Sequence, residues 1–453
     1  MPAITETDRF GLSLRGAAPI AASAALLLWP AAWNGYPLVF SDTGTYLSQA
    51  AAGYVGWDRP PFYSLAILPL HLALTTWPVV IVQALAVAAA VHGLCAPLPS
   101  TSPWRPTAIV AVLALLTPLP FFASQLMPDV FTGLVVLAIA RAFALPRSRA
   151  YPPRTKVLFV AVTTALIACH LSHLLLATSL VLALGIALRP GWRRIALASL
   201  PIALAALACV TVNTVAHGRV AIAPYSDVFL LARLLADGPA ARTLARDCPH
   251  ERWRVCAALA APPKDADDFL WRSDGVLASA GGAKAVAPEA STIVRRTVAA
   301  EPLATAASAL RNSATQLGMF ETGDGLNAWP DGVTPWMVRI FPASEVAAYG
   351  EARQQQGTLT VPRWMIALHF AAALTGIFGC IAAMLRGPRP LAIVAAAVLL
   401  ALPVNACVTG ALSGPHHRYQ ARIVWLPLAV SLAAAPFGAR HPAITAGAEA
   451  LAP

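Results

Sequence analysis

Two acidic residues and an arginine near the start of this chain have types and spacing that suit group-transfer chemistry. Asp42 lies in the run Ser41-Asp42-Thr43-Gly44, and Asp58 is followed directly by Arg59 and two prolines. A carboxylate can take a proton from an attacking hydroxyl or amine, and an arginine offers a fork of donors that matches phosphate oxygens. The stretch 34–69 is therefore predicted to carry chemistry, although an aspartate before a helix can also act as its cap.

A second group of polar residues lies near the other end of the chain, in the run Ser413-Gly414-Pro415-His416-His417-Arg418-Tyr419-Gln420-Ala421-Arg422. One interpretation is an interfacial anchor, in which arginine and tyrosine side chains reach the membrane surface. The other is an anion site in which His416, His417, Arg418, Tyr419 and Arg422 bind phosphate. We favour the anion site, because these arginines lie on the side where positive charge is disfavoured.

Three further residues extend this candidate site. Asp129 is predicted either to cap the segment that follows it or to work with Asp42 as a second catalytic acid. His170 and His173 are three positions apart, and structural or hydrogen-bonding roles are favoured over a metal site for them. Asp42, Asp58 and Asp129 are the only acidic residues outside the two tails and the segment 216–361.

The composition indicates an all-α polytopic membrane protein. Of its 453 residues, 58% are hydrophobic and 12% charged, and the mean hydropathy is +0.64. A spanning helix needs about 20 apolar residues, and the run 62–74 is short enough to be a surface helix instead. The predicted spans are 14–33, 78–95, 106–122, 129–144, 157–169, 172–187, 194–215, 364–385, 391–411 and 423–437.

The orientation depends on whether 157–188 is one helix or two. With a break near 169–173, 14 basic residues face the cytoplasm and four face outward, which the positive-inside rule favours over the 11-to-seven split of a single helix. Both termini are then cytoplasmic. The predicted parts are an N-terminal transmembrane module 1–215, an extracytoplasmic insert 216–361, a C-terminal transmembrane module 362–438 and a cytoplasmic tail 439–453.

The insert is predicted to be mainly helical, with helices over 228–235 and 291–317. It holds 14 basic and 15 acidic residues, so the net charge of +11 comes from short loops and gives no reason to expect nucleic-acid binding. Cys248 and Cys256 would lie where disulfides persist, and we expect them to be bonded. Asp265-Ala266-Asp267-Asp268 is interpreted as a helix start. Motifs of P-loop ATPases, HExxH metalloproteases and GxSxG hydrolases are absent from the sequence.

This layout resembles the GT-C glycosyltransferases, in particular the protein O-mannosyltransferases and lipid A aminoarabinose transferases. The resemblance rests on a first span, an outer loop with an aspartate, and the motif Arg59-Pro60-Pro61-Phe62-Tyr63 leading into a surface helix. It covers about residues 14–215. It implies a catalytic role for Asp42, contact of Arg59 with a lipid phosphate, and a second acid at Asp129. Asp58, Tyr63, His170 and His173 are further candidates for the substrate site. One departure is the single aspartate of the first loop, where some members have an adjacent acidic pair.

The predicted function is therefore transfer of a sugar from a polyprenyl-phosphate carrier to an envelope acceptor, in a bacterial inner membrane with lipids around it. The mechanism requires no cofactor, and use of a divalent metal stays open. The alternatives are a membrane transporter or flippase, which would place charges at mid-membrane depth, and a structural subunit of an envelope assembly.

Overall fold

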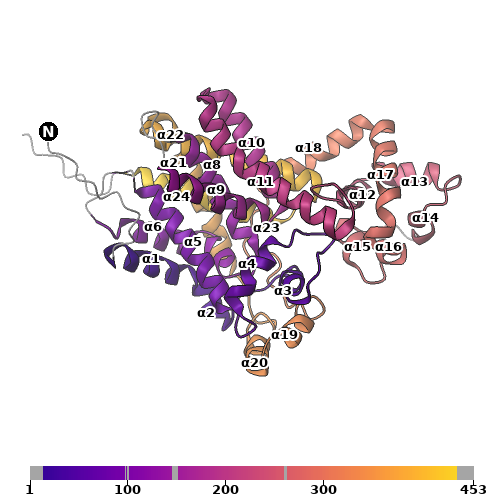
Figure 1. Cartoon of the computed structure of the whole chain (residues 1–453), viewed down its shortest axis with the longest axis horizontal. Coiled ribbons are helices and arrows are strands. Elements are labelled where there is room, and N and C mark those ends of the chain that lie inside the picture. The colour runs from indigo at the N-terminus through magenta and orange to yellow at the C-terminus, as the bar shows by residue number, and fades with distance from the viewer. Residues whose placement is uncertain (1–13, 97, 99–101, 145–151, 260–262, 436–453) are drawn as a thin grey trace, which may run out of the picture.

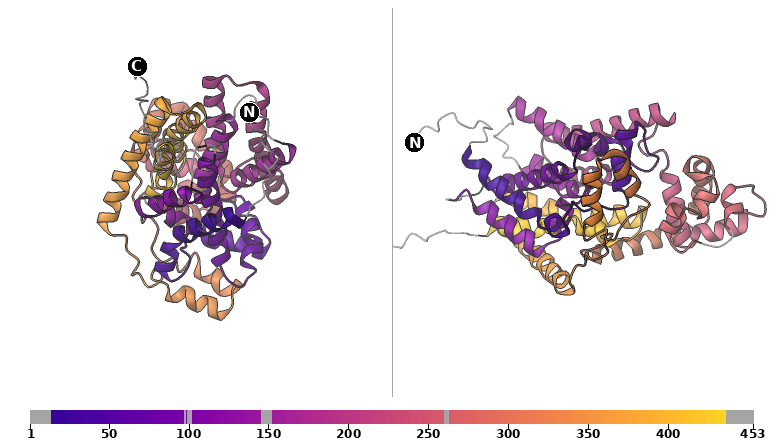
Figure 2. Two further views of the ribbon diagram at one scale, coloured as in Figure 1. Left: turned by 90° about the vertical axis from the view of Figure 1, so that its left-hand side faces the viewer. Right: turned by 90° about the horizontal axis from the view of Figure 1, so that it is seen from below.

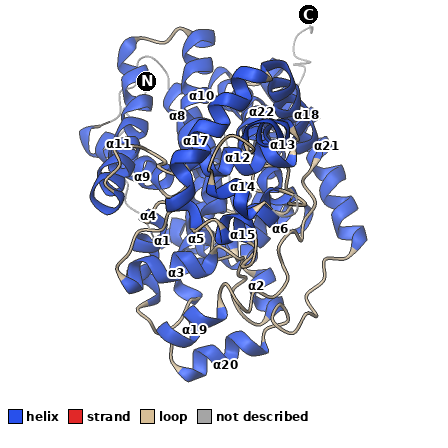
Figure 3. Cartoon of the chain, turned by 90° about the vertical axis from the view of Figure 1, so that its right-hand side faces the viewer, coloured by secondary structure: helices blue, strands red, loops and turns tan. Residues whose placement is uncertain are grey.

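The computed structural model describes residues 14–435 apart from 97, 99–101, 145–151 and 260–262. Figure 3 shows helices joined by loops, with no strand among the described residues. The expectation of an all-helical chain is confirmed for this part. The predicted cytoplasmic tail 439–453 and the first 13 residues lie outside it.

Among the described residues, five helices have the length and apolar composition to cross a bilayer. They are α5 (Trp77–Cys95), α10 (Leu171–Leu188), α11 (Trp192–His217), α21 (Arg363–Arg386) and α22 (Arg389–Leu412).

The other five predicted spans are also helical, but as shorter helices or helix pairs, so their crossing of the membrane stays a prediction. They are α1 (Leu14–Leu27) with α2 (Trp29–Asn34), α6 (Arg105–Leu116) with α7 (Leu119–Ala123), α8 (Phe131–Ala144), α9 (Pro153–Ala168) and α24 (Trp425–Ala434). These helices and the five long ones share one apolar core.

The predicted break near residue 170 is present. His170 has an extended backbone (φ −151°, ψ 130°) between α9 and α10. Its ring accepts a hydrogen bond from the backbone N–H of Ser172, which satisfies one of the free donors at the start of α10. Two helices, rather than one long helix, therefore occupy 153–188.

The segment 216–361 has two parts that pack in different places. Helices α12 to α17 enclose a core of their own and form what we call the lobe, which Figures 1 and 2 show at the end of the molecule away from α1 and α6. The lobe helices are α12 (Ser226–Ala236), α13 (Pro239–Asp247), α14 (Arg254–Ala258), α15 (Ala266–Trp271), α16 (Val276–Ser279) and α17 (Gly282–Ala300). Within the lobe, Cys248 and Cys256 form a disulfide.

The remainder of this segment leaves the lobe. The predicted helix over 291–317 is interrupted at Glu301, where Pro302 begins α18 (Pro302–Gly318), and α18 packs along α22. Next come α19 (Thr334–Ile340), which packs against α3 (Thr43–Ala52), and α20 (Ala343–Glu351), which lies beyond α19 in Figure 1. Buried side chains of 333–352 share a core with those of the first loop and α3. A long segment thus returns to support the loop that holds Asp42.

Candidate functional site

Pairing between two loops places Asp42 near Asp129. Leu38 forms an isolated parallel bridge with Gln125, with its N–H donating to the carbonyl of Ser124 at 2.9 Å and its carbonyl accepting from Leu126 N at 2.9 Å. Each aspartate follows its bridge residue by four positions. The parallel register therefore carries both acids to the same end of the pairing, which local sequence patterns could not show.

Asp42 is not a helix cap. It precedes α3, yet its side chain makes no capping hydrogen bond. Instead Oδ1 lies 2.7 Å from Arg59 Nη2, and Oδ2 lies 3.4 Å from Arg418 Nη2. Arg59 also pairs with Asp58 at 3.1 Å. The carboxylate thus joins two arginines that are far apart in the sequence.

Gly44 shows how tightly the segment 329–336 holds this loop. A Cβ at Gly44 would overlap the carbonyl oxygen of Gly332 and lie 3.2 Å from the Trp336 ring. Only glycine allows this approach of two backbones. The returning part of 216–361 therefore fixes the first turn of the helix that Asp42 precedes.

Asp129 lies in a short turn, η1 (Pro128–Val130), ahead of α8, and its side chain is 1% exposed. Its Oδ1 accepts from Arg422 Nη1 at 3.0 Å, and its Oδ2 lies 3.6 Å from Arg418 Nη2. Burial alone would raise the pKa of this carboxyl, but the charges of Arg418 and Arg422 outweigh it and hold the pKa below its ordinary value. Asp129 is therefore a charged, arginine-bound carboxylate.

Arg422 is fully buried and positioned by two residues that the sequence did not single out. Its Nη2 donates to Ser172 Oγ at 3.1 Å and to Asn405 Oδ1 at 3.0 Å. Asn405 is the only amide in the apolar run of α22, and Ser172 adjoins the His170 break. A polar residue within a spanning helix is the signal that could have identified Asn405.

Ion pairs connect three carboxylates and three guanidinium groups, whose charges balance. We call this set the charge cluster; its members are Asp42, Asp58, Asp129, Arg59, Arg418 and Arg422. Phe40 closes one side, since its ring centroid lies 3.9 Å from Arg418 Cζ. Buried charges are costly unless they are paired and hydrogen-bonded. The chain therefore keeps this arrangement at an energetic cost, which is typical of a functional site.

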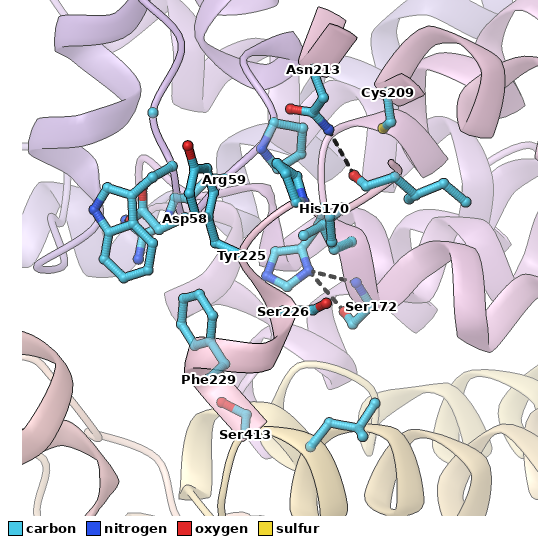
Figure 4. A pocket seen from close by; sticks show the side chains of 18 of the residues that line it. Asp58, Arg59, His170, Ser172, Cys209, Asn213, Tyr225, Ser226, Phe229 and Ser413 are labelled. Atoms are coloured by element: carbon cyan, nitrogen blue, oxygen red, sulfur yellow. Dashed lines mark hydrogen bonds and ion pairs between the residues drawn. The ribbon is translucent and has the colours of Figure 1, made fainter. Parts of the chain in front are cut away.

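A cavity of 460 Å³ adjoins the cluster at Asp58 and Arg59. Figure 4 shows His170 and Ser172 on one side of it and Phe229 and Tyr225 of the lobe on another. Apolar residues of three long helices line the rest, namely Leu171, Leu175, Cys209, Val212, Val408 and Leu412. Asp42, Asp129, Arg418 and Arg422 do not line this cavity. Arg59 is thus the arginine that connects the cluster to it.

Four of the remaining predicted site residues divide into two groups. Tyr419 and His170 line the cavity, and the Tyr419 ring lies 5.2 Å from Arg418 Cζ and 5.5 Å from Arg422 Cζ. His416 and His417 turn away from the cluster, because His416 Nε2 lies 3.5 Å from Asp267 of the lobe and His417 Nδ1 accepts from Glu321 N. The structure therefore does not bring these two histidines to the cavity.

Tyr63 and His173 do not line the cavity and are held by hydrogen bonds to neighbouring segments. The hydroxyl of Tyr63 donates to Gln83 at 2.6 Å, and its ring packs edge-on against Tyr46. Both ring nitrogens of His173 are occupied, Nε2 by Thr132 and Nδ1 by the Leu166 carbonyl.

Asp265 caps α15 by accepting a hydrogen bond from Asp268 N, as its motif predicted.

The described residues contain no group of three or more His, Cys, Asp and Glu side chains arranged to hold a metal ion. The site combines a partly buried carboxylate, Asp42, with an arginine beside the cavity, Arg59, and two further arginines, Arg418 and Arg422. That combination suits proton abstraction beside a bound anion. Compared with models of protein families, with curated proteins and with solved structures, the chain matches none.

Proposed function

We propose that the protein is a membrane glycosyltransferase that moves a sugar from a polyprenyl-phosphate carrier to an acceptor on the outer face of the membrane. One observation carries the proposal: Arg59 pairs with Asp42 at 2.7 Å and also lines a 460 Å³ cavity walled by apolar side chains of α10, α11 and α22. A ligand that reaches Arg59 through this cavity should combine a long apolar part with an anionic group. A polyprenyl phosphate has both.

In this proposal the carrier's phosphate binds at Arg59, in a cavity that His170 and Ser172 also line. Its apolar chain leaves between α10, α11 and α22, along Leu175, Val212 and Leu412. Charge-assisted hydrogen bonds from arginine to phosphate are among the stronger polar contacts in proteins. They would also stabilise the charge that grows on the phosphate as the sugar departs.

Asp42 is the proposed general base. It would take the proton from an acceptor hydroxyl or amine while the oxygen or nitrogen of that group forms a bond to the anomeric carbon of the sugar. The bond between the anomeric carbon and the phosphate oxygen breaks at the same time, and polyprenyl phosphate leaves with the bonding electron pair. Attack from the face opposite the leaving group inverts the anomeric centre.

Arg59 contacts the proposed base, Asp42, and is also the proposed site for the donor phosphate. In the structure Oδ1 of Asp42 is occupied by Arg59 and by the Ser41 hydroxyl at 2.9 Å. A phosphate bound at Arg59 would compete with Asp42 for the same guanidinium. Donor binding would thereby free the carboxylate to accept the acceptor's proton.

The test is a transfer assay with purified protein in lipid nanodiscs. Donors are polyprenyl phosphates carrying radiolabelled mannose or aminoarabinose, and acceptors are extracts of the cell envelope. Asp42→Asn keeps the shape of the side chain but cannot take a proton, so transfer should fall about 10²–10⁴-fold.

The matched control is Asp274→Asn, a carboxylate that pairs with Arg272 on the lobe surface. It should retain wild-type transfer. Transfer by Asp42→Asn at the wild-type rate would exclude Asp42 as the base. Binding of the carrier without any transfer would favour a transporter or flippase.

The outer location of the site is also part of the proposal and needs its own test. Ser273 lies exposed between α15 and α16 of the lobe and differs from cysteine by one atom. In intact cells, a thiol reagent that cannot cross membranes should label Ser273→Cys. Labelling only after lysis would place the lobe, and with it the charge cluster, on the cytoplasmic side.

A further inference from the structure

Two chemically different groups of side chains line the cavity beside the charge cluster. One group is aliphatic and comes from α10, α11 and α22. The other is aromatic and includes Trp57 of the first loop and Tyr225 and Phe229 of the lobe. The proposed donor accounts for the aliphatic group and for Arg59, but it leaves these three aromatic side chains without a role.

The aromatic side chains form a connected group. The ring centroids of Trp57 and Phe229 are 5.3 Å apart with planes at 30°, and Tyr225 meets Trp57 edge-on at 6.3 Å. Trp271 extends the group beyond the cavity, at 5.5 Å from Trp57, and is 46% exposed. We call Trp57, Tyr225, Phe229 and Trp271 the aromatic wall.

Polar groups border this wall. Asp58, Ser226 and Asp227 also line the cavity. The guanidinium of Arg59 lies 5.8 Å from the Trp271 ring centroid, within reach of a cation–π contact. Flat apolar faces with carboxylates and hydroxyls at their edge match a pyranose ring, which has one face of C–H groups and a rim of hydroxyls. Carboxylate oxygens accept hydrogen bonds from such hydroxyls.

We infer that the aromatic wall binds the sugar ring of the donor. This inference rests on the proposed function, since it takes the phosphate to be at Arg59. Trp57, Asp58 and Arg59 are consecutive, so a sugar attached directly to a phosphate at Arg59 lies beside Trp57. The lobe then contributes to sugar recognition, through Phe229 and Asp227, as well as to the wall of the cavity.

Packing offers a competing explanation for part of the wall. Trp57 contacts the apolar core of the lobe and so also joins the first loop to it. Packing alone predicts that substitutions at Trp57 and Phe229 change stability without affecting the choice between ligands. The ratio of each variant's affinities for a glycosylated lipid and for the same lipid without sugar separates sugar binding from packing.

The experiment measures dissociation constants of the purified full-length protein for farnesyl phosphate and for farnesyl phosphate carrying mannose or glucose. We expect the wild type to bind at least one glycosylated lipid about tenfold more tightly than farnesyl phosphate. Trp57→Leu and Phe229→Leu should bring that ratio close to one and leave the affinity for farnesyl phosphate nearly unchanged. Trp57→Phe keeps an aromatic face and should retain most of the preference.

Trp192→Leu is the matched control, because this tryptophan is 73% exposed at the opposite end of α11 from the cavity. Its ratio should equal that of the wild type. Equal binding of all three lipids by the wild type overturns the inference and leaves the proposed function standing. An unchanged ratio in both leucine variants also overturns it. Failure of the wild type to bind any of the three lipids overturns the proposed function itself.

Discussion

Two arginine–aspartate pairs in this protein have the same length but very different surroundings. Arg59 Nη2 lies 2.7 Å from Asp42 Oδ1, and Arg272 Nε lies 2.7 Å from Asp274 Oδ1. The first pair has side chains that are each 14% exposed, within a cluster of six charges. The second lies on the surface of the lobe, with side chains 51% and 73% exposed. Distance alone therefore does not distinguish a site from a surface contact.

Solvent explains the difference. Water screens the exposed pair and hydrates either partner when the pair opens, so such pairs contribute little to stability. A charge in the cluster loses most of its hydration, and removing one partner leaves the other buried and uncompensated. Substitutions in the cluster should consequently have much larger effects than the same substitutions in the lobe.

The largest effect is expected from Asp129→Asn. The amide cannot balance Arg418 and Arg422, both of which are buried, and loss of one partner of a buried pair costs about 3–5 kcal/mol. The free energy of unfolding, measured by SDS titration in mixed micelles, should fall accordingly. Asp274→Asn should leave the free energy of unfolding unchanged. An equal decrease in both variants would contradict the expected difference between the charge cluster and the lobe surface.

The pH dependence of stability should reflect the same carboxylate. The pKa of Asp129 is lowered in the folded protein, so its contribution is complete above the ordinary carboxyl pKa of about 4. Below that pH the unfolded chain takes up the proton first, and stability decreases as the pH falls toward the folded-state pKa. Wild type should lose stability more steeply than Asp129→Asn below pH ~4. Parallel curves for the two proteins would contradict this assignment.

Arg422→Lys should have an intermediate effect on stability. A lysine cannot bond Asp129, Ser172 and Asn405 together in the geometry of the guanidinium. Loss of a hydrogen bond to a charged group costs about 1.5–3 kcal/mol. The same SDS titration measures this, with Arg272→Lys as control. Wild-type stability together with weaker donor binding would instead make Arg422 a phosphate ligand, as the sequence had indicated.

Arg59→Lys should affect the donor more than the fold. Arg59 lines the cavity, and replacing its guanidinium with a single ammonium should raise the KM for the polyprenyl-phosphate donor about tenfold. Steady-state kinetics over a range of donor concentrations test this, again beside Arg272→Lys. A KM unchanged in both variants would place the phosphate elsewhere than at Arg59.

Local sequence predicted the helices well, because apolar runs and breaks act over a few residues. The break at His170 and the start of α15 at Asp265 were both predicted from their neighbours. Asp42 was harder, since a helix cap and a carboxylate paired with arginines have the same local signature. Only the partners of Asp42 distinguish the two, and Arg418 is 376 positions away.

The sequence by itself determined that this chain is helical, where its long apolar helices lie, and which few carboxylates it keeps among them. Tertiary structure decided which charges meet: Asp129 with Arg422 across 293 positions, and Asp42 with both Arg59 and Arg418. It also divided the segment 216–361 between the lobe and the support of the first loop. The physical reason is that the hydrophobic periodicity of a sequence indicates each helix separately, whereas the pairing of charged side chains depends on how the loops between helices pack together.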